Sequence, residues 1–242
     1  MRKSVATATL IAIVLAFKPA VAAALCGDVN DTNTITAADA LIVLKKAVHQ
    51  NVELICEQSS SPAQTGETVS HGPGSDGAVQ AGTPRQFKDN GDGTITDEAT
   101  GLMWEKKDHS GGLHEAGNTY SFSATGMNMD GTMATDFLAG MNADGGFAGH
   151  TDWRIPNVTE LESIKNYGIG TSAATFDEFN SDCAAGCTVI ACSCTRLDGY
   201  WSSTTHANNP VNGWNVSFNG AGTDPVGKTG GFSPVRAVRN VN

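Results

Sequence analysis

Four cysteines lie at positions 183, 187, 192 and 194, within twelve residues of one another. Such a cluster allows two kinds of chemistry. In a reducing compartment, closely spaced thiolates are typical zinc ligands. In an oxidising compartment they pair as disulfides. The choice depends on where the protein is located, and the N-terminus provides that evidence.

Residues 1–24 have the order of a secretory signal peptide. Arg2 and Lys3 precede an apolar run over residues 5–17, and an alanine-rich stretch follows it. At 13 residues the run is too short to span a bilayer, so we expect no transmembrane segment. The sequence therefore predicts an exported bacterial protein, secreted or retained in the periplasm or at the cell surface, with oxidised thiols.

In that compartment we predict two disulfides among the four clustered cysteines, and three pairings are open. A nested arrangement, Cys183–Cys194 around Cys187–Cys192, would make a small stapled hairpin. A Cys192–Cys194 bond is disfavoured because one intervening residue strains the geometry. The sequence alone does not choose the pairing.

Residues 25–57 form a candidate small module. Its residues 28–39, DVNDTNTITAAD, resemble a calcium loop of the dockerin or EF-hand type and precede an amphipathic helix. The resemblance implies that calcium is surrounded by Asp28, Asn30, Thr32, Thr36 and Asp39, with the carbonyl of Thr34 as a further ligand.

Two departures from that pattern leave a loop without an ion as an open alternative. Thr32 replaces an acidic ligand, and Asn33 stands where the sharp turn prefers Gly. Only one repeat is present, whereas a dockerin has two. Cys26 and Cys56 bracket the module and are predicted to pair, stapling a segment too small for a core of its own.

Charge and composition restrict the partners. Without residues 1–24 the chain has 12 basic and 25 acidic residues, a net charge of −13, which disfavours nucleic acid and anionic membranes. Residues 58–84 are rich in Ser, Gly, Pro and Thr without apolar periodicity, and are predicted to be a flexible linker. The main domain is then residues 85–242.

The first half of this domain combines a hairpin with a helix. Strands are expected through Phe87, Ile95 and residues 102–104, and the Asn90–Gly93 sequence favours a plain tight turn over a calcium loop. Residues 120–131 are predicted to be a polar surface loop. An apolar stripe then predicts an amphipathic helix, formed by Ala134, Phe137, Leu138 and Met141.

A second helix follows with its start signal in the sequence. Asn157 is a cap with Glu160 at the capping-box spacing, and Pro156 discourages helix before it. Further strands are predicted at residues 200–205, 214–218 and 235–238. The turn-rich inserts between them, 208–210 and 227–231, are the natural place for ligand-facing variation.

No complete catalytic constellation is visible in the sequence, so we expect a protein that is not an enzyme. His109 and His114 lie in a glycine-rich loop, and His150 is two residues from Asp152; these are predicted to be solvated rather than metal-binding. The candidates for stacking on a sugar ring are aromatic, with core packing as the alternative for each: Tyr200, Trp201 and Trp214.

Five motifs in order carry a family resemblance: DNGDGTITDEATGLMW (89–104), DWRIPNVTELESI (152–164), YWSSTT (200–205), GWNVSF (213–218) and VRAVRN (235–240). With them, residues 87–239 resemble the Lcl C-terminal domain family, named for a bacterial collagen-like adhesin. The family is similar to C-type-lectin-like domains and to formylglycine-generating enzymes, whose turn into a helix residues 154–157 resemble. The resemblance implies an α+β domain with two helices, a small twisted antiparallel sheet and long loops.

The named adhesin of the family implies attachment to host glycans, including sulfated ones. The acidic charge argues against sulfated or other polyanionic ligands here. We therefore expect a binding or adhesion module that recognises a glycan or an extracellular protein through its loops. The alternatives are a structural or assembly protein that docks through residues 26–56, and an oxidase similar to formylglycine-generating enzymes.

Overall fold

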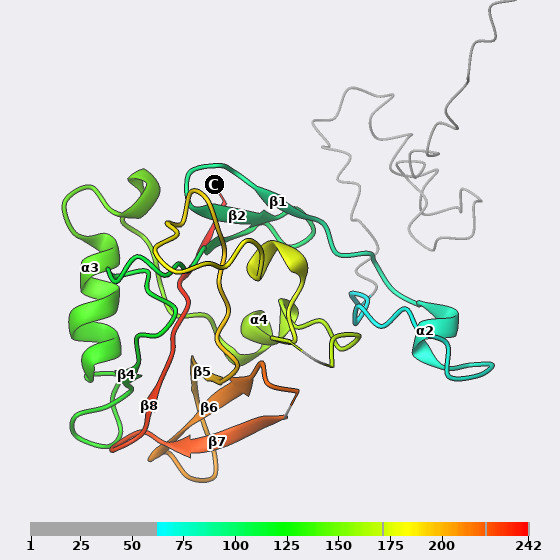
Figure 1. Cartoon of the computed structure of the whole chain (residues 1–242). Helices are drawn as coiled ribbons and strands as arrows, with labels where there is room; N and C mark the ends of the chain where they lie inside the picture. The colour runs from blue at the N-terminus through cyan, green and yellow to red at the C-terminus, as the bar shows by residue number, and fades with distance from the viewer. Residues whose placement is uncertain (1–61, 171, 221, 242) are drawn as a thin grey trace, which may run out of the picture. The chain divides into compact units, whose positions relative to one another are not determined.

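The computed structural model describes residues 62–170, 172–220 and 222–241, which belong to one compact unit (Figure 1). The signal peptide, the Cys26–Cys56 pair and the calcium ligands lie outside the described residues and stay predictions; these ligands are Asp28, Asn30, Thr32, Thr34, Thr36 and Asp39. Within the described ranges, no helix has the length and apolar character needed to cross a membrane.

Three small antiparallel sheets form the β-structure of the described residues. The first has the order β1-β2-β3-β9, with β1 (Phe87–Asp89), β2 (Thr94–Asp97), β3 (Leu102–Glu105) and β9 (Val238–Asn240). The second pairs β4 (Tyr120–Ser121) with β8 (Phe232–Ser233). The third has the order β5-β6-β7, with β5 (Gly199–Thr205), β6 (Asn212–Ser217) and β7 (Thr223–Gly227).

The C-terminal segment connects two of these sheets. In Figure 1 it runs from β8, at the bottom of the view, to the four-stranded sheet at the top, where β9 pairs with β3.

The strand β7 contains Pro225 and lies at an edge of its sheet, where a residue without a backbone N–H is tolerated.

The predicted β1–β2 turn is a plain hairpin. Asn90 donates its side-chain amide to Thr94 Oγ1 at 2.8 Å, and Asp92 Oδ1 accepts the Thr94 N–H at 3.0 Å. Asp89 forms an ion pair with Lys106 at 2.7 Å. Because both carboxylates already have partners, the turn is stabilised without an ion.

Both predicted helices are confirmed. The first consists of a π-helical segment, η1 (Met133–Leu138), that continues into α3 (Ala139–Asn142). The second, α4 (Val158–Ser163), has the complete capping box: Asn157 Oδ1 accepts from Glu160 N at 2.9 Å, and Glu160 Oε2 accepts from Asn157 N at 2.8 Å. The remaining helical pieces are short: α2 (Asp76–Val79), η2 (Phe147–Gly149) and η3 (Asp177–Phe179).

The predicted surface loop at 120–131 needs correction, because it contains β4 and a buried aromatic ring. Phe122 packs edge-on against Trp201, with ring centroids 5.5 Å apart. The predicted strand at 235–238 is displaced toward the C-terminus, because β9 is Val238–Asn240. Its residue Ala237 instead donates its N–H to the side chain of Glu105.

Part of the predicted linker has local structure. Thr83 donates its N–H to Pro62 O at 3.0 Å, and α2 lies between the two residues. Tyr167 donates its N–H to Thr65 O at 2.9 Å, which attaches this segment to the loop after α4. The described part of the segment is therefore hydrogen-bonded both internally and to the main domain.

A buried polar network joins the segments around the core. The Glu105 carboxylate is fully buried; it contacts Lys107 Nζ at 2.9 Å and His114 Nδ1 at 2.8 Å, and it accepts the Ala237 N–H at 2.9 Å. Arg236, also buried, donates to the Glu105 carbonyl and to the Cys194 carbonyl. Burial alone would raise the pKa of Glu105, but Lys107 and His114 outweigh it and hold that pKa below its usual value.

The described residues thus form a mixed α+β domain with few helices, as predicted, but with several small antiparallel sheets in place of the single small sheet that was expected. Its apolar interior has two main clusters. One surrounds Trp104 and Phe179, and the other surrounds Phe137, Trp153 and Trp201.

We expect Asn157→Ala to destabilise the protein by about 0.5–2 kcal/mol, because the Glu160 N–H then loses its acceptor. Asn157→Ser keeps a hydroxyl acceptor and should stay close to the wild type. Urea denaturation followed by tryptophan fluorescence measures both variants. Equal stability of the Ala and Ser variants would contradict the capping argument.

Candidate functional site

Two of the three aromatic candidates are in the core. Tyr200 and Trp201 are 1% and 0% exposed. The Tyr200 hydroxyl accepts the Arg196 N–H at 2.8 Å, and Trp201 Nε1 donates to the Tyr120 carbonyl at 2.9 Å. Neither ring offers a face to solvent, so the interpretation of these two residues as sugar-stacking residues is corrected in favour of core packing.

Trp214 has a different environment. It lies on β6, is only partly buried, and is absent from both main clusters of the core. Its ring contacts that of His206 edge-on, with centroids 5.2 Å apart and an interplanar angle of 63°. His206 starts a turn that is closed by its N–H bond to the Asn212 carbonyl, at 3.0 Å. Trp214 is thus the predicted aromatic that solvent can reach.

Three loops are tied together by Lys228. Its Nζ donates to the Met127 carbonyl and to Thr205 Oγ1, each at 2.8 Å. Its backbone N–H donates to the Val211 carbonyl, and its carbonyl accepts from Ser123 N. We call the three segments, residues 123–130, 205–212 and 227–231, the Lys228 loops.

The lysine that holds these loops is 1% exposed. Its ammonium lies 4.7 Å from the centroid of the Phe122 ring, a cation–π distance. Burial lowers the pKa of Lys228, because the charged form loses its hydration. The two oxygen acceptors and the ring compensate for that loss only while the loops keep this arrangement.

A second polar contact shapes the first of the Lys228 loops. The Asp130 carboxylate accepts from Ser123 Oγ at 2.8 Å, from Thr125 Oγ1 at 2.7 Å and from Ala124 N at 2.8 Å. The side-chain bonds from Thr125 and Ser123 lower the pKa of Asp130 to about 2. The loop is therefore built around an ionised carboxylate.

Large apolar side chains on and beside the Lys228 loops are exposed to solvent. Met127 is 58% exposed and Val211 is 47% exposed. Phe232, the next residue after the third loop, is 62% exposed. Contiguous exposed apolar side chains mark binding surfaces, so these residues are candidates for one.

Most cationic side chains of the described residues, by contrast, form ion pairs or hydrogen bonds within the domain. The described residues contain 10 Lys and Arg against 20 Asp and Glu. Arg154 makes two hydrogen bonds of 2.7 Å to Glu160, and Arg239 pairs with Asp152 at 2.7 Å. Lys106, Lys107 and Arg196 also have carboxylate partners, while Lys228 and Arg236 donate to carbonyl groups. Most of the cations in the described part of the chain are therefore engaged in contacts within the domain.

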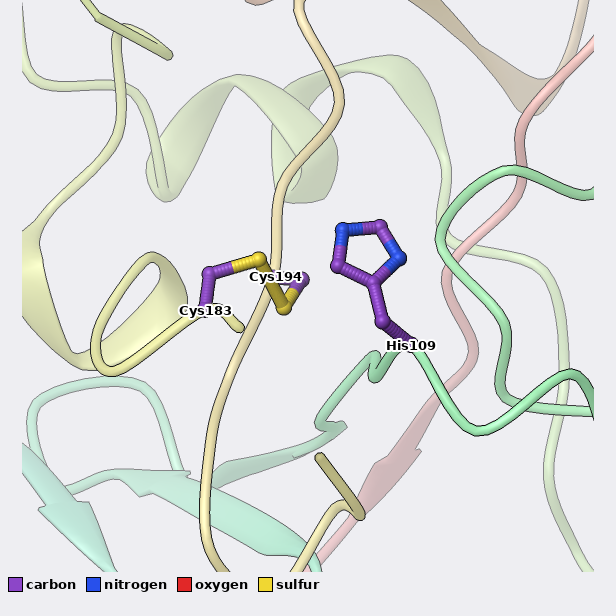
Figure 2. Close-up of side chains that lie close together, drawn as sticks. All are labelled: His109, Cys183 and Cys194. Carbon is purple, nitrogen blue, oxygen red and sulfur yellow. A yellow bond between two sulfur atoms is a disulfide. The ribbon is translucent and has the colours of Figure 1, made fainter. Parts of the chain in front are cut away.

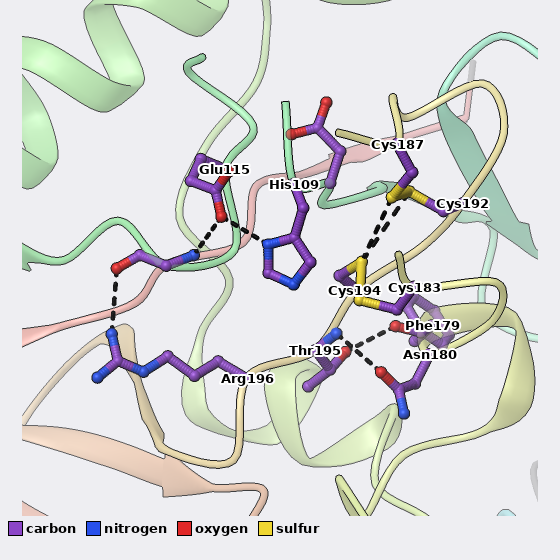
Figure 3. The surroundings of a disulfide bond; sticks show 12 residues. His109, Glu115, Phe179, Asn180, Cys183, Cys187, Cys192, Cys194, Thr195 and Arg196 are labelled. Carbon is purple, nitrogen blue, oxygen red and sulfur yellow. Dashed lines mark hydrogen bonds and ion pairs between the residues drawn. A yellow bond between two sulfur atoms is a disulfide. The ribbon is translucent and has the colours of Figure 1, made fainter. Parts of the chain in front are cut away.

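The clustered cysteines form two disulfides in the nested arrangement, Cys183–Cys194 and Cys187–Cys192 (Figure 3). His109 and His114, which were both expected to be solvated, have carboxylate partners. His109 Nδ1 lies 2.7 Å from Glu115 Oε1, and His114 Nδ1 is bonded to the buried Glu105.

The sequence did not single out Lys228 or Asp130. Each is one charged residue in a polar, glycine-containing stretch, a pattern that is typical of solvated turns. The available signal was the position of Lys228 within the insert 227–231, where ligand-facing loops were expected. Its partner Met127 lies 101 residues away in the chain, so the contact has no local signature.

Comparison with known families identifies the domain. The model of the Lcl C-terminal domain matches residues 93–239, more than half of the 242-residue chain. The chain therefore belongs to the Lcl C-terminal domain family, which confirms the resemblance carried by the five motifs. Among curated proteins no match was found.

We expect Lys228→Met to loosen the Lys228 loops, because the two acceptors lose a charged donor, at a cost of about 1–3 kcal/mol. Amide hydrogen exchange should become faster in residues 123–130 and 205–212. Lys88→Met, an exposed lysine on β1, is the matched control and should change stability by less than about 0.5 kcal/mol. Unchanged exchange in both loops of the Lys228 variant would contradict the assignment.

The lowered pKa of Asp130 leads us to expect that the loop at residues 123–130 loses stability in acid. The folded pKa of this carboxylate lies below the unfolded value, so its contribution to stability is present above about pH 4 and is lost as the pH falls through about 2. The protection of residues 123–130 against amide hydrogen exchange, relative to the intrinsic rate at each pH, should fall in that window when followed from pH 5 to 2. Asp130→Asn should abolish this pH dependence; a wild-type profile in the variant would show that another group is responsible.

Proposed function

We propose that this member of the Lcl C-terminal domain family is an exported binding module that holds a glycan or a protein ligand at the Lys228 loops. The observation that carries the proposal is the combination of exposed apolar side chains with a buried lysine that ties the loops together. Loops held in one conformation lose little entropy on binding, which favours affinity.

The ligand in this proposal is not a polyanion. The described residues have a net charge of −10, and nearly all of their cations already have partners. A sulfated chain would meet repulsion without a compensating guanidinium or ammonium group. A neutral sugar or an apolar protein segment fits a surface that bears Met127, Val211 and Phe232.

Trp214, which contacts His206 of the second Lys228 loop, is the candidate sugar-stacking ring. An aromatic face packs on the C–H groups of a sugar, and the adjacent His206 supplies a polar edge. Tyr200 and Trp201 pack in the core and are not part of the proposed contact with the ligand.

We propose binding rather than catalysis as the activity. The candidates for acid–base or thiol chemistry have structural partners: the four described cysteines are paired, and His114 is held by Glu105. A C-type-lectin-like arrangement is part of the proposal, supported by the Arg154 to Asn157 turn that leads into α4. Calcium in the 25–57 module remains a separate proposal.

A glycan array probed with the full chain tests the function, once with calcium and once with chelator. We expect binding to a neutral sugar class and none to sulfated glycans. Trp214→Ala should weaken that binding by about 10-fold or more, the usual cost of losing a central aromatic contact.

Tyr167→Ala is the matched control, because Tyr167 is an exposed aromatic that lies after α4, outside the Lys228 loops. It should leave binding unchanged. Selective binding to sulfated glycans would contradict the charge argument. Equal losses in the Trp214 and Tyr167 variants would place the binding site elsewhere.

A further inference from the structure

The two disulfides lie against each other and beside an imidazole. Cys194 Sγ is 3.9 Å from Cys187 Sγ and 3.9 Å from Cys192 Sγ. In Figure 2 the ring of His109 lies next to the Cys183–Cys194 bond. A nitrogen of this ring and the Cys183 and Cys194 sulfurs are all within 4.8 Å of one another.

His109 is oriented as metal-binding histidines are. Its Nδ1 is bonded to Glu115 Oε1 at 2.7 Å, which leaves Nε2 available as a ligand atom. Glu115 is in turn fixed by the N–H groups of Gly111 and Gly117. These bonds hold the Glu115 carboxylate in place against Nδ1 of the His109 ring.

The two sides of this cluster are held together by bonds other than the disulfides. The His109 N–H donates to the Cys187 carbonyl, and Gly186 donates to the His109 carbonyl. Cys194 donates its N–H to the Lys107 carbonyl at 2.8 Å. Ser181 and Ser193 exchange two backbone hydrogen bonds. Opening the outer disulfide therefore leaves its two sulfurs near the imidazole.

The outer disulfide is the more accessible of the two to a reductant in solution. Cys183 is exposed and Cys187 is partly buried, while their partners Cys194 and Cys192 are each 1% exposed. Access to a sulfur is a main determinant of the rate of thiol–disulfide exchange. Limited reduction should thus open Cys183–Cys194 first and leave Cys187–Cys192 intact.

We propose that, when the outer disulfide is reduced, Cys183, Cys194 and His109 form a zinc site. Two thiolates and an imidazole are a recognised three-ligand set for Zn²⁺ that keeps a fourth position open. In tetrahedral geometry with Zn–S bonds of about 2.3 Å, the two sulfurs would be roughly 3.8 Å apart. The open position faces solvent, because the His109 side chain is 39% exposed and Cys183 is exposed.

The chemistry balances with a dithiol as reductant. The dithiol gives two electrons and two protons, its own two S–H groups become one S–S bond, and the Cys183–Cys194 bond becomes two S–H groups. Zn²⁺ then binds both sulfurs as thiolates and releases the two thiol protons to solvent. The site is absent in the oxidised protein and is formed by reduction.

The test is a zinc titration of the full chain carrying Cys26→Ser and Cys56→Ser, before and after limited dithiol treatment and removal of the dithiol. A competing chromophoric chelator reports binding, and Co²⁺ in place of Zn²⁺ gives the absorption of a tetrahedral thiolate complex. We expect no zinc bound to the oxidised chain and one per chain after reduction. Cys183→Ser should abolish binding, and Glu115→Gln should weaken it about 10- to 100-fold.

Two controls make the ligand set falsifiable. Cys187→Ser with Cys192→Ser removes the inner disulfide and should retain one zinc; loss of zinc from this variant, with far-UV circular dichroism unchanged, overturns the proposed set. His109→Gln should weaken binding at least about 10-fold, whereas His71→Gln, at an exposed position, should not. A reduced chain that binds less than one zinc, whether folded or unfolded, overturns the proposal.

Discussion

The burial of the Glu105 carboxylate is the constraint on which most of the structure depends. A carboxylate removed from water is stable only when donors surround it, and its donors come from three segments: Lys107 and His114, which follow it in the chain, and Ala237. Arg236 extends the same network to the carbonyls of Glu105 and Cys194. One buried anion thus fixes β3, the C-terminal segment and the cysteine-containing segment relative to one another.

Lys228 applies the same principle to the loops beside the third sheet. There the buried group is a cation, and its partners are Met127, Thr205 and an aromatic ring. In both cases a charged group loses its hydration and is stabilised by polar partners at fixed positions. Each charge therefore holds segments that have little regular structure in one arrangement. The described residues use most of their few cations in such internal contacts, which relates the interior to the proposed specificity.

Local signals in the sequence predicted the local elements. The Asn157–Glu160 capping box, the Asn90–Gly93 turn and the apolar stripe of η1–α3 each depend on residues a few positions apart, and each was confirmed. The burial of Tyr200 and Trp201 could not be read in this way, because an alternating strand does not say which face is covered. The Ala237–Glu105 contact spans 132 residues, and its geometry is decided only by the tertiary fold.

The cysteine segment shows why composition left two chemistries open. Thiols placed close enough to form disulfides are also close enough to share a metal, so spacing alone does not separate the two outcomes. In the structure the distinction lies in what holds the sulfurs. Because Cys194 is fixed by Lys107 on one side and by Arg236 on the other, its position follows from the Glu105 network rather than from its disulfide partner. Cys183, the partner of Cys194 in the outer disulfide, is exposed to solvent. Whether Cys183 is oxidised or reduced therefore decides whether the proposed zinc site can form.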